Sequence, residues 1–270
     1  MNQGSFLTVP LAVFRNRRLI AKLARSDFRT RYAGSYLGII WAFIQPVVTV
    51  LIYWFIFGFG FKSSAPTSVP FVLYLVAGIV PWFYHQEVLM SGTNVLMEYS
   101  YLVKKVVFDI RILPTVKAVS AFFVHAFFVL VTLLIALLYG YKPSIYLVQL
   151  IYYFLALFLL SIGMCYTTCA VVVFFRDLTQ IISIILQIGI WTIPVMFDPA
   201  MFSFGDRYGF IFKINPMYYI VNGYRDAVYA RAWFFEHPLS TLYFWCVTVF
   251  LLVFGSVVFK RLQPHFADVL

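Results

Sequence analysis

The sequence predicts an all-α membrane protein with six transmembrane helices. The prediction also includes an N-terminal amphipathic interfacial helix, a short cytoplasmic helix, and re-entrant or interfacial helices before the last span. Hydrophobic residues make up 63% of the 270 residues and charged residues only 11%, whereas a soluble domain has about 25% charged residues. Long stretches contain no Asp, Glu, Lys or Arg, and the basic residues are concentrated in a few segments between these stretches.

Six apolar stretches are long enough to cross a bilayer, because a hydrocarbon core of about 30 Å takes roughly 20 helical residues. Lipid cannot hydrogen-bond an open backbone, and the period-two alternation of a membrane β-barrel is absent, so the stretches are predicted to be helices. The predicted spans are about residues 37–61, 69–90, 119–141, 145–175, 180–197 and 242–259. The first span contains Gln45 and Pro46, and we expect the proline to kink it.

Residues 1–36 are predicted to be a cytoplasmic tail that ends in an amphipathic helix. Basic residues recur there at helical spacing, with apolar residues on the opposite side. The basic residues are Arg18, Lys22, Arg25 and Arg29, and the apolar ones are Leu19, Ile20, Leu23, Ala24 and Phe28. Such a helix lies on the membrane surface. It either anchors the topology on anionic lipid or also handles a substrate, and these interpretations are compatible.

The distribution of basic residues predicts the orientation. Seven precede the first span, four lie between the second and third spans, and two follow the last. With Arg176, one face carries 14 of the 20 basic residues and the other face six. Cytoplasmic loops carry the excess of Lys and Arg, so both termini, including the tail 260–270, are expected in the cytoplasm. We expect no cleaved signal peptide, because no short apolar segment with a small-residue cleavage site is present.

Two connections are long enough to have a function of their own. The cytoplasmic connection 91–117 mixes apolar and charged residues and suits a short surface helix presented to a partner. The external region 198–240 is rich in aromatic residues. We therefore expect it to form, in part, re-entrant or interfacial helices whose backbone faces protein or a cavity.

The predicted spans contain few ionisable side chains. Glu87 is the only carboxylate within a predicted span, and the histidines His85 and His125 have no acidic partner in sequence. An ion-driven carrier normally needs ionisable groups there. Cys165, Cys169 and Cys246 are expected to pack rather than to bind metal.

No phosphate-binding GxxxxGK[ST] loop occurs, so energy from ATP would have to come from another subunit. We also find no nucleophile elbow, paired carboxylates or metal cluster, and no catalytic or metal site is predicted. The spans do offer aromatic side chains, among them Tyr53, Trp54, Phe57 and Trp191. These rings either line a conduit for sugars or serve as core packing and interfacial belts.

Several short motifs occur in an order that resembles a known family. They are RSDFRTRYAGSYLGIIWAFIQP at 25–46, LVKKVVF at 102–108 with Pro114, FFRDL at 174–178, IPVMF at 193–197, INP at 214–216, GYRD at 223–226 and FADVL at 266–270. Together with the six spans, they resemble the type-2 ABC exporter permeases of the O-antigen, capsule and teichoic-acid class. The resemblance covers nearly the whole chain. One departure is Asp109, where related chains often have proline.

The resemblance implies a homodimer in the bacterial inner membrane, bound to two copies of a separate ATPase. The chain alone would not be an enzyme and would hold no cofactor, because ATP and Mg would be bound by the partner subunit. The cargo would be a polysaccharide linked to a polyprenyl diphosphate, and the first and fifth spans would line the channel.

The resemblance also assigns roles to residues. The connection 91–117 would contain a coupling helix that docks on the ATPase through Asn94, Leu96, Tyr99, Leu102 and Val107. The amphipathic helix would be a gate for the lipid. Its residues Arg25, Arg29 and Arg31 would contact the diphosphate, since guanidinium groups suit that geometry, and Tyr32 would belong to the same gate. Lys104 and Lys105 would also contact the diphosphate or would simply anchor the loop.

Two other functions remain open at this point. One is export of a smaller lipid or drug on the same scaffold. The other is a membrane-embedded transferase that acts on lipid-linked sugars, which the scarcity of carboxylates in the spans disfavours.

Overall fold

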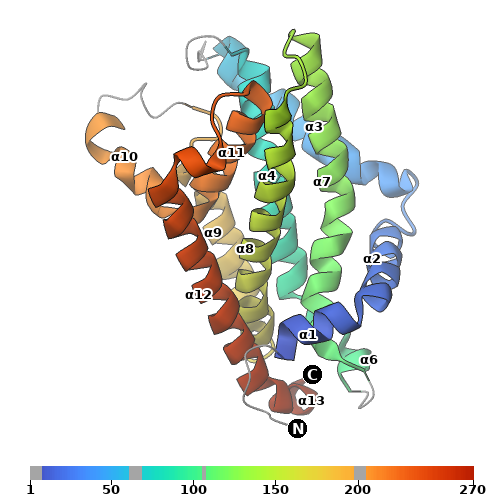
Figure 1. The fold of residues 1–270 in the computed structure, drawn as a ribbon. Coiled ribbons are helices and arrows are strands. Elements are labelled where there is room, and N and C mark those ends of the chain that lie inside the picture. Colours follow the sequence, from blue (N-terminus) through green and yellow to red (C-terminus); the bar gives the residue numbers. More distant parts are fainter. Residues whose placement is uncertain (1–7, 61–68, 105–107, 198–204) are drawn as a thin grey trace.

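The computed structural model describes residues 8–60, 69–104, 108–197 and 205–270, and the regular elements of these residues are all helices (Figure 1). The longer helices are α1 (Thr8–Arg15), α2 (Arg17–Arg31), α3 (Trp41–Tyr53), α4 (Phe71–Thr93), α7 (Leu113–Leu138), α8 (Gln149–Val172), α9 (Leu178–Thr192), α10 (Gly205–Ile214), α11 (Pro216–Tyr229) and α12 (Pro238–Leu262). The shorter elements are η1 (Gly38–Ile40), the π-helix η2 (Trp54–Gly60), α5 (Val95–Glu98), α6 (Ser100–Val103), η3 (Ile110–Ile112), η4 (Ile145–Val148), η6 (Phe234–Glu236), η7 (Gln263–His265) and α13 (Phe266–Val269).

Five helical stretches among the described residues are long and apolar enough to cross a membrane. They are Gly38–Gly58, Phe71–Thr93, Ile110–Leu138, Ile145–Val172 and Pro238–Val269. These stretches correspond to the predicted spans one to four and six. The protein is therefore an all-α membrane protein.

The fifth predicted span differs from the expectation. Helix α9 has 15 residues, which at 1.5 Å per residue gives about 22 Å. It ends at Thr192 because Ile193 precedes Pro194, and a residue before proline is pushed out of the helical region. Ile193 is accordingly extended, with φ −113° and ψ 134°. The end of the predicted span, 193–197, is thus not helical.

Local sequence signals place several helix ends. Proline lies in the first turn of α7, α11 and α12, where its missing N–H has no helical partner to lose. Helix α7 is followed by Gly140 with φ +86°, a conformation that favours glycine. Helix α7 begins at Leu113, six residues before the predicted span, because Pro114 can start a helix.

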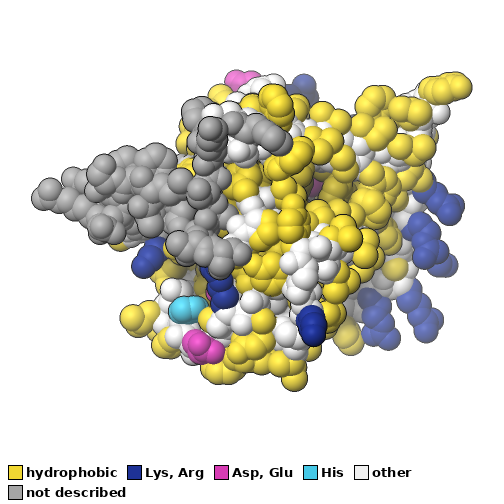
Figure 2. All heavy atoms as spheres, turned by 90° about the horizontal axis from the view of Figure 1, so that it is seen from above, with side chains coloured by type: hydrophobic (Ala, Val, Ile, Leu, Met, Phe, Trp, Pro, Cys, Tyr) yellow, Lys and Arg dark blue, Asp and Glu magenta, His cyan; other side chains and the backbone are white. Residues whose placement is uncertain are grey.

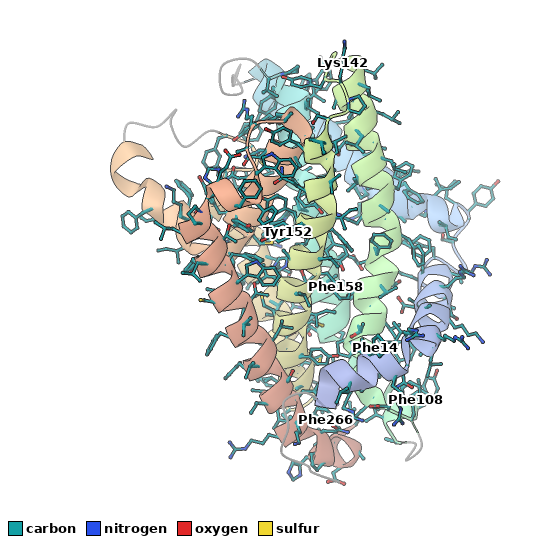
Figure 3. The ribbon with its side chains drawn as sticks, in the orientation of Figure 1. Phe14, Phe108, Lys142, Tyr152, Phe158 and Phe266 are labelled. Atoms are coloured by element: carbon teal, nitrogen blue, oxygen red, sulfur yellow. The ribbon has the colours of Figure 1, made fainter. Side chains whose placement is uncertain are left out.

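The segments predicted to be cytoplasmic gather at one end of the bundle, here called the α13 end (Figure 1). Phe108 and Phe266 lie at this end and Lys142 at the opposite end (Figure 3). The turn between α8 and α9 is also there, because the rings of Phe174 and Phe266 are 6.1 Å apart. At the opposite end the rings of Tyr141 and Tyr229 are 6.0 Å apart.

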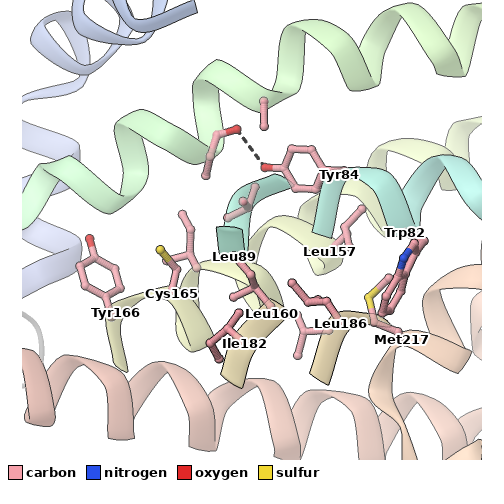
Figure 4. Packing of buried hydrophobic residues seen from close by; sticks show 14 of the residues in the cluster. Trp82, Tyr84, Leu89, Leu157, Leu160, Cys165, Tyr166, Ile182, Leu186 and Met217 are labelled. Carbon is pink, nitrogen blue, oxygen red and sulfur yellow. Dashed lines mark hydrogen bonds between the residues drawn. The ribbon is translucent and has the colours of Figure 1, made fainter. Parts of the chain in front are cut away.

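Helix α4 forms the centre of the bundle. It packs against α7, α8, α9 and α11, and most of its side chains are buried. Figure 4 shows this core, in which Tyr84 and Leu89 of α4 face Leu157 and Leu160 of α8. The Tyr84 hydroxyl donates to the carbonyl oxygen of Ala118 at 3.1 Å. By contrast, α3 and the outer side of α9 expose large apolar side chains, part of an extensive apolar surface (Figure 2).

Part of the external region 198–240 packs into the bundle rather than lying in solvent. Most side chains of α11 are buried against α4 and α8. Arg225 of α11 is fully enclosed, donates to the carbonyl oxygens of Val195 at 2.9 Å and Tyr74 at 3.4 Å, and stacks 3.5 Å above the Tyr74 ring. The GYRD motif thereby ties α11 to α4 and to the IPVMF segment.

Helices α8 and α12 touch through their backbones at Gly163 and Gly255. A Cβ atom on Gly255 would lie 2.5 Å from the carbonyl oxygen of Gly163, and one on Gly163 would lie 3.0 Å from the nitrogen of Leu252. Small residues allow this approach, which favours van der Waals packing between membrane helices.

We expect Gly255→Ala to separate α8 from α12 and to destabilise the protein by about 1–3 kcal/mol, the usual cost of overpacking. The measurement is the Tm of the purified protein in detergent. Val257→Ile is the matched control, since it also adds one carbon to α12 but at a side chain that is half exposed. Equal Tm values for the two variants would contradict the close approach.

Candidate functional site

Five charged side chains near the α13 end form one connected group, here called the ion cluster. It comprises Asp27 and Arg31 of α2, Glu87 of α4, Glu98 of α5 and Lys117 of α7. The Lys117 ammonium lies 2.7 Å from Asp27 and 2.5 Å from Glu98. Arg31 donates to Asp27 at 3.3 Å and is also paired with Glu87. The cluster therefore joins four helices.

The position of Asp27 follows from the helical repeat of α2. The buried side chains of α2 are Ile20, Ala24 and Asp27, which lie on one face. Ile20 and Ala24 pack against Ile112 and Val116 at the start of α7. Asp27 thus points at α7, where Lys117 meets it, and both side chains are only 5% exposed.

The electrostatics favour the charged form of Asp27. Burial by itself raises the pKa of this carboxyl, but the hydrogen bond and charge of Lys117, with the charge of Arg31, hold the pKa below its usual value of 3.8. The Tyr99 hydroxyl donates a hydrogen bond to the Asp27 carboxylate at 3.0 Å. Burial and the nearby Asp27 charge raise the pKa of Tyr99, so this tyrosine stays a neutral donor.

A cavity of about 290 Å³ extends from the ion cluster between α3, α4 and α7. Arg31, Tyr32 and Glu87 line it near the cluster, and Gln45 and Tyr53 line it along α3. The lining combines hydrogen-bonding groups with aromatic rings. Across the described part of the chain, no group of three His, Cys, Asp or Glu side chains could hold a metal ion.

The predicted gate residues divide into two groups. Arg25 and Arg29 are exposed on α2. Figure 2 shows that Lys and Arg side chains gather along one edge of the molecule. Arg31 and Tyr32 turn toward the cavity, and the Arg31 guanidinium is engaged by two carboxylates. Lys104 is exposed at the end of α6, and Lys105 lies outside the described residues.

The residues predicted to couple to an ATPase are only partly accessible. Leu96 is fully buried, Tyr99 and Leu102 are half-buried, and Val107 lies outside the described residues. Asn94 is half-buried and accepts a hydrogen bond from Thr179 of α9 at 2.8 Å, which links α4 to α9. These roles stay predictions.

The side chain of Tyr101 is large and 59% exposed, and the sequence did not single it out. It lies in α6, beside the exposed Lys104. Apolar and charged residues are mixed in this segment. The sequence pattern therefore could not predict which side chains are exposed.

The aromatic residues predicted to line a conduit lie where η2 meets α9. The ring centroids of Tyr53 and Phe57 are 6.5 Å apart, and those of Phe57 and Trp191 are 6.4 Å apart. Trp54 is half-buried and Trp191 is 53% exposed. Three of the four rings therefore form a chain from α3 to α9, while their role as channel lining stays a prediction.

The two histidines within the spans are each hydrogen bonded to a side chain of another helix. His85 is hydrogen bonded to Ser161 at 2.8 Å, and His125 to the Tyr224 hydroxyl at 2.9 Å. Cys165 and Cys169 are buried, and Cys246 is exposed.

Asp27, Lys117 and Glu98 were not among the predicted site residues. Two signals were present in the sequence. Asp27 interrupts the apolar face of α2, and Lys117 follows Pro114 in an otherwise apolar segment. Their pairing spans 90 residues, and such a contact cannot be inferred from local periodicity.

We expect Lys117→Met to detach α2 from α7, because it leaves the buried Asp27 carboxylate without its closest cation. Removing one partner of a buried pair costs about 3 kcal/mol or more. The measurements are Tm and hydrogen exchange of the α2 amides. Arg25→Met, which removes an exposed cation from the same helix, is the control and should change both little.

The pH dependence gives a second readout of the same contact. The pKa of Asp27 is lowered on folding, so its contribution is present above about pH 3.8 and is lost as the pH falls through the lowered pKa. Protection of α2 should therefore be lost in acid, and Asp27→Asn should remove that step. If α2 still loses protection in acid in the Asp27→Asn variant, the loss is caused by another titrating group.

Comparison with known proteins agrees with this fold. The family model described as ABC-2 type transporter matches residues 18–229. An O-antigen export system permease protein RfbA of Myxococcus xanthus is 25% identical over 256 residues, covering 95% of this chain and 96% of the relative. Two proteins of the same name from Klebsiella pneumoniae are 25% and 26% identical, and each alignment covers 93% of this chain and 95% of the relative. The chain belongs to the ABC-2 type transporter family.

Proposed function

We propose that this chain is the membrane subunit of an ATP-driven exporter in the bacterial inner membrane. Its cargo is a polysaccharide similar to O-antigen, linked to a polyprenyl diphosphate. ATP and Mg are bound and hydrolysed by a separate subunit. The observation that carries the proposal is the similarity, over at least 93% of this chain, to proteins named as O-antigen export permeases.

The surface of the bundle supports a homodimer with a channel between two copies. Helix α3 and the outer side of α9 expose large apolar side chains, and Phe57 and Trp191 bring the two surfaces together. In this arrangement α9 and the following residues 193–197 complete a sixth crossing, and both termini lie in the cytoplasm. The chain of rings from Tyr53 to Trp191 would then border the channel.

The ion cluster suggests how a partner could act on the spans. Glu98 of α5 and Tyr99 both bind the Asp27–Lys117 pair, so a displacement of α5 and α6 reaches α2 and α7 through charged contacts. Tyr101 and Lys104 are exposed in this segment, where a separate ATPase could contact them. The coupling helix of the proposal is therefore centred on α5 and α6.

In this proposal the diphosphate of the cargo binds to cations on the exposed side of α2. Arg25 and Arg29 are accessible there, and each guanidinium can hold two phosphate oxygens. Arg31 is already held by Asp27 and Glu87, so in this proposal it positions the helix rather than binding cargo. The adjoining cavity, with Gln45 and Tyr53, offers polar and aromatic contacts to the first sugars.

The proposal is tested by deleting the gene in a strain without a redundant exporter. Surface polysaccharide should disappear, lipid-linked polymer should accumulate inside, and the purified chain should hydrolyse ATP only with its partner. Normal surface polymer with loss of a small lipid outside would favour export of a smaller lipid. Turnover of a lipid-linked sugar by the chain alone would favour a transferase.

We expect Tyr101→Glu to weaken binding of the ATPase by about tenfold, equivalent to about 1.4 kcal/mol, because the aromatic side chain that the partner would cover is replaced by a charge. The measurement is ATPase affinity by titration in nanodiscs, together with export. Tyr139→Glu is the matched control, since Tyr139 is 51% exposed at the opposite end of the bundle. Equal effects of the two substitutions would contradict the proposal that α6 contacts the ATPase.

A further inference from the structure

Two hollows on the surface of the bundle meet at Phe14 of α1. The first is an apolar groove of about 350 Å³ between α1, α8 and α12. Val13 and Phe14 border it on α1, Phe158 and Ile162 on α8, and Leu252 and Val253 on α12. Figure 3 shows Phe14 and Phe158 on the same side of the bundle, in its half nearer the α13 end.

The groove offers almost no polar group to a ligand. Tyr166, which also borders it, donates its hydroxyl to the carbonyl oxygen of Arg111 at 2.8 Å and lies 3.2 Å from the Thr115 hydroxyl. The groove is part of the membrane-facing surface, because α8 and α12 belong to helices long enough to span the membrane. An acyl chain is the chemical group that fits such a surface.

The second hollow is strongly basic. It lies where α1 and α2 join and approach η3, and Arg15, Arg17 and Arg18 border it together with Asp109 and Arg111. Arg111 is neutralised by Asp109, to which it donates at 2.7 and 2.9 Å. The other three arginines are exposed and make no ion pair with any residue that the structure describes. The hollow thus carries a net charge of about +3, which attracts an anion.

Phe14 borders both hollows, so that they form one continuous surface. Its ring is 69% exposed, and the Arg17 guanidinium lies 5.1 Å from the ring centroid. The junction of α1 and α2 is fixed by Asn16, whose side chain donates to the carbonyl oxygen of Ala12 at 2.9 Å. A basic hollow directly beside an apolar groove matches a lipid with an anionic headgroup.

We propose that this surface is a binding site for an anionic phospholipid of the bilayer. The phosphate binds Arg15, Arg17 and Arg18, and one acyl chain occupies the groove between α1, α8 and α12. The occupant is a bilayer lipid rather than the exported cargo, because the groove and the cavity beside α3 share no lining residue. The bound lipid would hold α1 against the bundle.

The test measures binding of phosphatidylglycerol to the full chain in detergent by native mass spectrometry, with phosphatidylcholine as the uncharged comparison. Replacing Arg15, Arg17 and Arg18 together by Gln should lower the affinity roughly 100-fold, about fivefold for each cation. The matched control replaces Arg176, Lys260 and Arg261 by Gln, which removes the same charge at the same end of the bundle but outside the hollow. Equal losses in the two triple variants would overturn the site.

The groove is tested separately by Val253→Trp, which fills it without changing charge. Val249→Trp, one helical turn before Val253 and outside the groove lining, is its control. We expect Val253→Trp to weaken phosphatidylglycerol binding and Val249→Trp to leave it unchanged. Unchanged binding in both variants would overturn the acyl-chain assignment.

Two competition experiments distinguish the source of the phosphate. Glycerol phosphate, which has no acyl chain, should compete poorly, and effective competition would reduce the site to an anion site. Polyprenyl diphosphate should displace phosphatidylglycerol no better than its charge predicts. Strong preference for polyprenyl diphosphate would identify a cargo site and overturn the proposal, whatever the outcome of the export experiment.

Discussion

The contact between the Lys117 ammonium and the Asp27 carboxylate, 2.7 Å apart, determines how the amphipathic helix is attached to the bundle. A buried charge is tolerated only beside an opposite charge, so Asp27 of α2 must face Lys117 of α7. Glu98 and Tyr99 then complete the shell around this pair. Helix α2 thereby has one position on the bundle, set by charge as well as by the apolar contacts of Ile20 and Ala24.

The same contact divides the cations of α2 by role. Arg31, four residues after Asp27, is drawn into the cluster, whereas Arg25 and Arg29 lie on the exposed side. A helix that presents cations outward and a carboxylate inward can be attached to protein and still face anionic headgroups. In the proposed exporter this combination allows α2 to contact lipid-linked cargo without leaving the bundle.

The fold class and most spans could be predicted from the sequence, because an apolar run of this length has few alternatives to a membrane helix. The end of α9 was placed too late, since hydropathy does not register that Ile193 precedes Pro194 and leaves the helix. The ion cluster was missed because Asp27 and Lys117 are 90 residues apart. Leu96 and Tyr101 lie five residues apart in one segment, and only the packing of α5 and α6 decides which of them is buried.

Arg225, at the other end of the bundle from the ion cluster, is held in a different way. Its donors meet the carbonyl oxygens of Tyr74 and Val195, and carbonyl oxygens do not titrate. The cluster at the α13 end depends on carboxylates, which do. Acid on one side of the membrane would therefore loosen the attachment of α2, whereas acid on the other side would leave the anchor of α11 in place.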